Sequence, residues 1–347
     1  RIMKIIQYIL GIGIAIGGIS LTAGCNSLDK EPDDQLTIEM IFSDKIRTED
    51  WLASVYSSIP SPIWGYMRDE GYNLMSDDMV IPNEWTPYGW ANAYAFTTGN
   101  WSPVSSWNPN YWVELPKRIR TGLIFLNRVR VLPGEGLTEE YVDQMKYEVR
   151  FLIAYYYSLM AQTYGAVPFA PNKLYDTNSS PEELMTEQTP YDSIVNWIDK
   201  EMLEVSRHLP AVYENDQDWG RATSVMALAI RAKTLLFAAS PLFNGNTDYA
   251  DWKNKSGENL INPTYSQDKW ARAAEAHKDL ITTAEAAGYQ LYQEYNSDNS
   301  IDPFMSYYNM SLKRFSDGNK EIIFGRPENK DLKSWQSHRL PKGIGGN

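Results

Sequence analysis

The clearest pattern in the chain is a helical repeat of apolar residues between positions 141 and 164. The apolar residues are spaced by three and four positions, which places them on one face of an α-helix: Val142, Met145, Val149, Leu152, Tyr156 and Leu159. Gly165 and then Pro168 follow, an order typical of a helix end. The pattern therefore predicts a long helix with one buried face.

Five further segments carry start and stop signals for helices. Expected helices run over residues 48–58, 111–131, 189–209, 223–240 and 266–288. Thr48, Thr189, Thr223 and Ser266 are the expected N-caps, because their hydroxyls can accept from the first free backbone N–H groups. Pro116 is expected to kink or interrupt the second helix, since it lacks an N–H group.

The last two of these helices carry small residues on their expected inner faces. The inward residues of the first are Val225, Ala229, Ala232, Leu236 and Ala239, and those of the second are Trp270, Ala274, His277, Ile281 and Ala284. Such residues let successive helices pack closely. The sequence therefore predicts a mainly α fold of tetratricopeptide-like helix pairs, although no strict 34-residue repeat is present. The segment 321–324 (EIIF) is a short strand candidate.

Between these helices lies an irregular stretch, residues 59–109, that is rich in Pro, Gly, Asn and aromatic residues. Six of the 12 tryptophans fall within residues 61–112. Aromatic faces with nearby polar groups are typical of ligand sites, and a sugar ring can stack on such a face. The candidate ligand-binding residues are Trp85, Tyr88, Trp90, Trp101, Asn83 and Asn92. The alternative is that these aromatics form the core of the irregular region.

The start of the chain has the pattern of a signal peptide. Lys4 precedes an apolar run of about fifteen residues (5–19), which is shorter than the roughly eighteen that a spanning helix needs. Small residues then lead into Cys25, an order that resembles a bacterial lipobox. We expect a signal peptide over residues 1–24, a lipidated acidic tether over 25–40 and a helical domain over 41–347. The alternative is an incidental cysteine.

Composition excludes several classes of function. The net charge of -12 argues against a nucleic-acid partner, because phosphate binding requires a basic surface. A single cysteine excludes a disulfide framework or a multi-cysteine zinc site, and no two of the three histidines have metal-ligand spacing. We therefore expect no metal and no cofactor. Arg150 and Arg221 are expected to form salt bridges between packed helices.

Four segments together resemble a known family. They are RFLIAYYY (150–157), GRATSVMALAIRAKTLLFAA (220–239), KWARAAEAHKDLITTAEAAGYQLY (269–292) and NKEIIF (319–324). In this order they resemble the SusD/RagB family of Bacteroidetes. The resemblance implies surface-exposed outer-membrane lipoproteins that capture glycans for a SusC-type TonB-dependent transporter. Family members are usually longer, so the resemblance also implies a chain truncated at its C-terminus.

The expected function is glycan binding without catalysis. One alternative is capture of peptides, as in the RagB branch. Another is a glycoside hydrolase, which requires two carboxylates flanking the scissile bond. The scarcity of predicted strands disfavours the barrel on which many such enzymes are built. A helical scaffold that binds only proteins is a third alternative, and the tryptophan-rich stretch argues against it.

Overall fold

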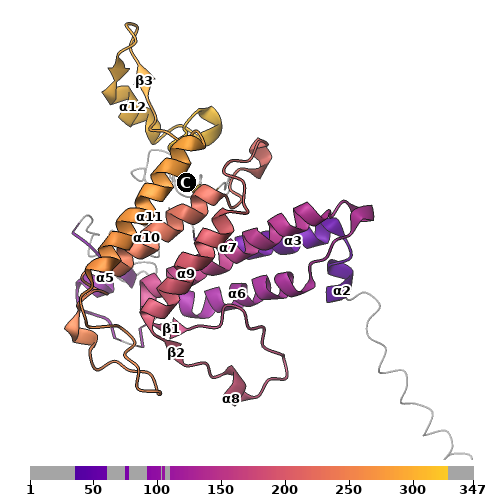
Figure 1. Ribbon diagram of the computed structural model, residues 1–347, viewed down its shortest axis with the longest axis vertical. Helices are drawn as coiled ribbons and strands as arrows, with labels where there is room; N and C mark the ends of the chain where they lie inside the picture. The colour runs from indigo at the N-terminus through magenta and orange to yellow at the C-terminus, as the bar shows by residue number, and fades with distance from the viewer. Residues whose placement is uncertain (1–35, 61–74, 78–91, 103, 106–109, 327–347) are drawn as a thin grey trace, which may run out of the picture.

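A computed structural model of the chain describes residues 36–60, 75–77, 92–102, 104–105 and 110–326. Helices account for most of the regular structure in these residues, and the strands among them are two-residue segments in two small sheets. Figure 1 shows the long helices lying side by side, in an order that follows the chain from indigo to orange. The mainly α fold predicted from the sequence is therefore confirmed.

The first long helix, α3 (Lys45–Tyr56), begins one turn earlier than predicted and follows the short helix α2 (Ile38–Ile41). Its N-cap is Asp44, whose carboxylate accepts from the Arg47 N–H at 2.9 Å. Thr48 is instead buried inside the helix, where its hydroxyl donates to the Asp44 carbonyl at 2.7 Å. The prediction of Thr48 as the N-cap is wrong because two capping residues lie one turn apart and packing buries the second.

Helix α6 (Tyr111–Arg128) runs through Pro116 without a break. Pro116 lies in the second turn, where its missing N–H removes one hydrogen bond to the Trp112 carbonyl, and the helix continues beyond it, so the predicted interruption does not occur. Further along, Gly122 allows a close helix contact, because a Cβ there would lie 3.1 Å from a methyl group of Val149. The α6 helix therefore packs tightly on the next helix of the chain.

Helix α7 (Glu139–Tyr164) is the centre of the core. Thr138 caps its start by accepting from the Tyr141 N–H at 3.2 Å. The predicted apolar face is buried, with Leu159 partly so, and further residues on other sides of the helix are buried too: Phe151, Ile153, Ala154, Tyr157 and Met160. The helix is therefore enclosed by neighbours on more than the one predicted side.

A small sheet separates α7 from the next long helix. The elements in chain order are β1 (Val167–Pro168), α8 (Pro181–Leu184), β2 (Gln188–Thr189) and α9 (Tyr191–Ser206). The two strands are antiparallel, and Thr189 pairs with Val167. Thr189 is therefore a strand residue and Pro190 is the N-cap, without a capping hydrogen bond. The prediction of Thr189 as the cap is wrong because the sheet occupies that position.

Helix α10 (Ser224–Ala239) begins as predicted. Thr223 accepts from the Met226 N–H at 3.1 Å and caps the helix. Val225, Ala232 and Ala239 are buried, as expected. Leu236 was placed on the inner face, but it is exposed and its neighbour Leu235 is buried instead.

Helix α11 (Gln267–Ala286) begins after the predicted N-cap, Ser266, although this hydroxyl makes no capping hydrogen bond, and it ends two residues before the predicted end. Its buried face differs from the predicted one. Its fully buried residues are Ala273, Ala276 and Ala284. Trp270 and Ile281, which were predicted to face inward, are 37% and 56% exposed. The expected stripe is therefore wrong over most of its length, and only its last member, Ala284, is buried.

After α11 the chain forms a hairpin and a short helix, β3 (Glu294–Tyr295), β4 (Ile301–Asp302) and α12 (Pro303–Met310), which project from the end of α11 at the top of Figure 1. Glu294 pairs with Asp302 in an antiparallel register. The segment 321–324 is not a strand. Phe324 packs instead on Phe151 and Tyr155 of α7, with ring centroids 5.9 and 5.3 Å apart.

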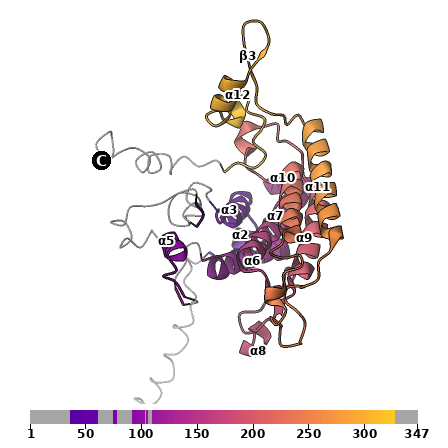
Figure 2. The same ribbon diagram turned by 90° about the vertical axis from the view of Figure 1, so that its left-hand side faces the viewer.

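The long helices form a layer in which successive elements touch. Helix α6 packs on α7, α7 on α9, α9 on α10 and α10 on α11, while α3 covers α6 and α7. Figure 2 views this layer from its edge, with α11 at one side and α5 (Asn92–Thr97) standing apart at the other. Short 3-10 turns complete the order: η4 (Pro133–Glu135), η5 (Asp216–Asp218), η6 (Thr247–Tyr249) and η7 (Phe315–Asp317).

Candidate functional site

Of the six predicted ligand-binding residues, Trp101 is the one whose side chain the structure describes. Asn92 is the first residue of α5. The other four, Asn83, Trp85, Tyr88 and Trp90, lie outside the described residues, as does the predicted lipid attachment residue Cys25. The candidate site is therefore built from Trp101 and its surroundings.

Trp101 is placed by a reversal of the chain after α5. Gly99 has a φ of 68°, a left-handed conformation that glycine adopts without strain. Its N–H donates to the Phe96 carbonyl at 3.2 Å, and the Asn100 N–H donates to the Ala95 carbonyl at 2.8 Å. The chain turns back, and Trp101 stacks on Phe96 with ring centroids 4.7 Å apart and planes 28° apart.

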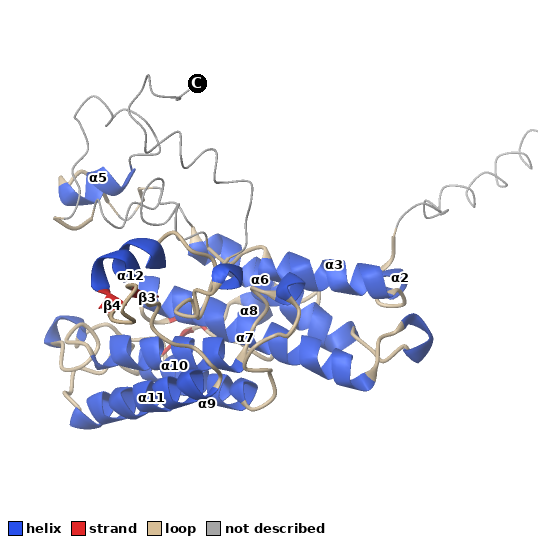
Figure 3. Cartoon of the chain, turned by 90° about the horizontal axis from the view of Figure 1, so that it is seen from above, coloured by secondary structure: helices blue, strands red, loops and turns tan. Residues whose placement is uncertain are grey.

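The Trp101 platform, meaning the stacked pair Trp101 and Phe96, is open on one side. Trp101 is 51% exposed although its ring is held by Phe96. Exposed polar residues accompany it: Thr97, Thr98, Asn100 and Ser102. Figure 3 shows α5 set off from the helix layer, so the layer does not cover it. A rigid ring with uncharged hydrogen-bonding neighbours can bind a ligand that has one apolar face and several hydroxyl groups.

The sequence around the platform carries no charge. Residues 85–113 contain no Asp, Glu, Lys, Arg or His, in a chain in which 22% of residues are charged. The stretch contains four asparagines, Asn92, Asn100, Asn108 and Asn110, besides its serines and threonines. A surface of this composition can recognise neutral polar ligands through hydrogen bonds, and it offers no ion pair to a charged one.

The end of this stretch shows that its aromatic residues have two roles. Tyr111 is buried in the core at the start of α6, as the alternative interpretation of the aromatics expects. Trp112 is 43% exposed and meets Tyr164 edge to face, with centroids 5.4 Å apart. Its backbone N–H donates to the Tyr164 hydroxyl at 3.1 Å. Trp112 is therefore a second exposed indole on the helix layer itself.

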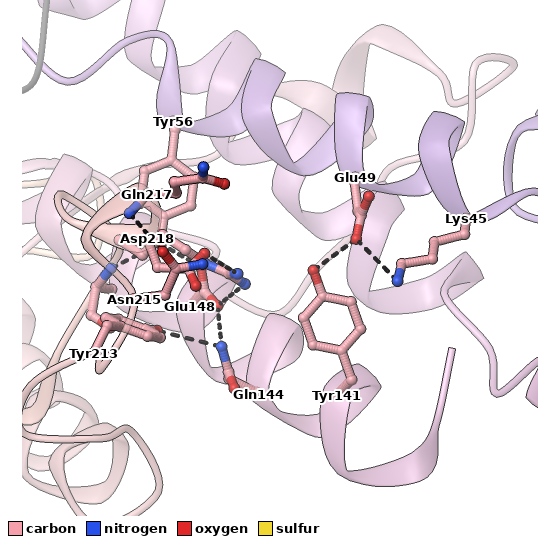
Figure 4. A network of polar contacts seen from close by, with 12 residues as sticks. Lys45, Glu49, Tyr56, Tyr141, Gln144, Glu148, Tyr213, Asn215, Gln217 and Asp218 are labelled. Atoms are coloured by element: carbon pink, nitrogen blue, oxygen red, sulfur yellow. Dashed lines mark hydrogen bonds and ion pairs between the residues drawn. The ribbon is translucent and has the colours of Figure 1, made fainter. Parts of the chain in front are cut away.

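A buried carboxylate anchors the end of α3, just before the chain enters the aromatic-rich stretch. Glu148 of α7 is fully buried and accepts from the Tyr56 hydroxyl at 2.6 Å and from Gln144 at 3.1 Å. Arg221 donates to both carboxylate oxygens, at 2.5 and 3.2 Å. Figure 4 shows Tyr56 of α3 pointing toward Glu148 and Gln144 of α7. The predicted salt bridge of Arg221 is present, although Arg221 lies in the segment before α10 rather than on a helix.

Tyr56 completes the network. Its hydroxyl also accepts from the Ala222 N–H at 2.9 Å, which links α3 to the segment before α10. Burial, and then the adjacent negative charge of Glu148, raise the pKa of Tyr56 well above its ordinary value, so the residue stays neutral. The predicted salt bridge of Arg150 is also present, because its guanidinium contacts Glu201 of α9 at 2.6 and 3.0 Å.

The described residues contain no group of three His, Cys, Asp or Glu side chains that could hold a metal ion. Within the same residues, no helix has both the length and the apolar character needed to cross a membrane. His277 packs on α11 with its ring Nδ1 2.7 Å from the Ala273 carbonyl oxygen.

Several solved structures share the fold of this chain, with low to moderate sequence identity. The structure named BT4246 is 28% identical, with a TM-score of 0.69, and the match covers 84% of this chain and 52% of that one. A SusD-like protein from Bacteroides fragilis is 17% identical, with a TM-score of 0.58, over 88% of this chain and 48% of that one. A laminarin-binding SusD-like protein is 17% identical, with a TM-score of 0.53, over 82% and 51%.

The chain spans about half the length of these solved relatives. No curated protein is similar enough in sequence to count as a match. The profile of one family, SusD-like, described as "Starch-binding associating with outer membrane", matches residues 27–236. Because this match covers more than half of the chain and the tetratricopeptide-like helical fold agrees, the protein belongs to the SusD-like family.

Proposed function

We propose that the protein is a glycan-binding lipoprotein of the outer-membrane surface, without catalytic activity, that captures nutrient glycans for a SusC-type TonB-dependent transporter. The family description, which refers to starch binding and the outer membrane, supports this proposal. So do the names of two structural neighbours, a laminarin-binding protein and a surface glycan-binding protein A from Bacteroides fluxus.

Among the described residues, the Trp101 platform is the feature that supports glycan binding. Its indole is held by Phe96 and about half exposed, within a stretch that has no charged side chain. The apolar face of a pyranose ring can cover the indole while Asn and Thr groups bond its hydroxyls. The lack of charge favours a neutral polysaccharide as the ligand, because an acidic glycan would find no cation among residues 85–113.

The alternative functions receive less support. A glycoside hydrolase needs a pair of carboxylates close to the bound sugar, and residues 85–113 supply none. The names of the neighbours refer to glycans rather than peptides, which favours glycans over the peptides of the RagB branch. A test of the ligand must nevertheless include both classes.

The test is affinity gel electrophoresis with neutral polysaccharides, such as starch, laminarin and xylan, beside acidic ones and a peptide mixture. We expect retardation by at least one neutral glycan. Trp101→Ala should weaken it about tenfold or more, because covering on the order of 100 Å² of indole stabilises a complex by about 2.5 kcal/mol.

The matched control is Trp270→Ala on α11, which removes an indole that is 37% exposed from another part of the molecule. This variant should bind glycan as well as the unmodified protein. Unchanged affinity in Trp101→Ala with correct folding would refute the platform. Retardation by acidic glycans alone, or binding of peptides alone, would refute the neutral-glycan proposal.

A further inference from the structure

A cavity of about 330 Å³ lies between α7 and α10. Residues 59–60, after α3, and residues 323–326 form its remaining walls. The apolar part of the lining consists mainly of large side chains, among them Tyr155, Leu159, Ile230, Phe237 and Phe324. The volume is within the range of pockets that bind small molecules, and the lining is apolar, as in most such pockets.

The charged side chains around this α7–α10 cavity are all positive. Among the described residues, Lys233 and Arg326 line it, and no Asp or Glu does, although the chain has 44 acidic and 32 basic residues. The Arg326 guanidinium donates to the Ile59 carbonyl at 2.9 Å, which holds this charge beside the cavity. The charged side chains described at the cavity are therefore cationic, in a protein of net charge -12.

Lys233 makes no hydrogen bond or ion pair with the residues that the structure describes, whereas Lys269 of α11 contacts Asp192 at 2.6 Å. The two aliphatic hydroxyls in the lining already donate to backbone carbonyls, Ser158 to Tyr155 at 2.7 Å and Thr234 to Ile230 at 2.7 Å. The cavity thus offers an ammonium group beside a mostly apolar lining, in which the Gln162 amide and the hydroxyls of Tyr155 and Tyr191 are the other uncharged polar groups.

We propose that the α7–α10 cavity binds a small carboxylate with an apolar ring, of the arylpropanoate class. The ring would lie among the side chains of Tyr155, Phe237 and Phe324, and the carboxylate would meet Lys233 at the rim. A sugar fits less well, because burying its hydroxyls without partners costs free energy. The site lies on α7 and α10 rather than on α5, so it goes beyond the proposed glycan binding and does not depend on it.

Isothermal titration of the protein with 3-phenylpropanoate tests the proposal. We expect saturable binding, at least tenfold weaker binding of the uncharged 3-phenylpropanol, and no binding of glucuronate, which has the carboxylate but a polar ring. Lys233→Met should weaken phenylpropanoate about tenfold, since a hydrogen bond to a charged group contributes about 1.5 kcal/mol. Lys200→Met, which neutralises an exposed lysine of α9, is the control and should leave affinity unchanged.

A second variant fills the cavity. Ala229 lines it, so Ala229→Leu places added methyl groups in open space and should abolish binding while circular dichroism remains unchanged. Absence of phenylpropanoate binding to the folded, unmodified protein would overturn the proposal. So would equal binding of glucuronate, or full affinity in Lys233→Met. Glycan retardation in the same preparations reports on the proposed function separately.

Discussion

At the scale of single residues, Glu148 shows how much one buried charge depends on its partners. It lies next to Val149 in the apolar repeat of α7, and the repeat itself gave no reason to expect a buried carboxylate. Burial of a charge is unfavourable unless every part of it is paired, and here Tyr56, Gln144 and Arg221 together supply the donors. The arginine was predictable as a salt-bridge residue, and its partner was not.

We expect Glu148→Ala to lower the free energy of unfolding by about 3–5 kcal/mol, because it leaves the Arg221 guanidinium without its main partner. Glu201→Ala breaks a matched pair with Arg150, whose side chain is more exposed, and should cost only about 1 kcal/mol. Urea unfolding of both variants at neutral pH measures the difference. Equal losses would show that burial of Glu148 does not determine the strength of its pair.

The candidate site was predictable only in part at this scale. The exposed indole of Trp101 was anticipated from the density of aromatic residues along the chain. The ring beneath it, Phe96, was not, because the contact depends on the left-handed conformation of Gly99 that reverses the chain. A glycine between two aromatic residues is the signal that points to such a stack.

At the scale of elements, Gly165 is expected to determine how α7 ends. Its φ of 72° and ψ of -116° belong to a region that residues with a side chain rarely adopt. We expect Gly165→Ala to destabilise the protein by about 1–3 kcal/mol through backbone strain, since a Cβ there would meet no atom closer than 3.6 Å.

Gly134→Ala is the control for this prediction. Gly134 does not have a left-handed φ, and no atom lies within 4 Å of an added Cβ. This variant should be neutral or slightly stabilising, because alanine restricts the unfolded chain more than glycine does. Thermal unfolding of the two variants side by side gives the comparison, and equal melting temperatures would contradict the assignment of strain to Gly165.

The helices themselves were predicted well where caps and periodicity agree, as in α7 and α10. The buried face of α11 was not, because close packing against α10 selects the small residues Ala273, Ala276 and Ala284 over the larger Trp270 and Ile281. Residues 321–324 have the composition of a strand but pair with no strand, and their apolar side chains pack on α7. The size and hydrophobicity of side chains therefore do not predict which residues are buried where contacts between elements determine the packing.

At the scale of the whole molecule, the two proposed binding sites differ in their charge. The chain carries a net charge of -12, yet residues 85–113 are uncharged and the described charged residues that line the α7–α10 cavity are Lys233 and Arg326. Long-range electrostatics would repel an anionic polymer from most of the surface, while a small carboxylate can enter a local positive cavity. The two proposals therefore assign different ligand classes to different parts of one molecule.

The remaining prediction concerns how the molecule is held at the cell surface. Cys25 is the only cysteine of the chain and follows an apolar run and small residues, so we propose that it carries the lipid anchor. Each buried CH₂ group of an acyl chain contributes about 0.8 kcal/mol, and two or more chains anchor a protein stably. We expect the unmodified protein to incorporate labelled fatty acid and to sediment with outer membranes.

Cys25→Ala should lose the label and appear in the soluble fraction, whereas Ser27→Ala, two residues further along, should behave like the unmodified protein. The experiment belongs in cells that lack the SusC-type transporter, because binding to that partner would retain the protein at the membrane without a lipid. If Cys25→Ala still sediments with outer membranes in such cells, the anchor does not depend on this cysteine. If it is released there but retained when the transporter is present, both the lipid anchor and the proposed partner are supported.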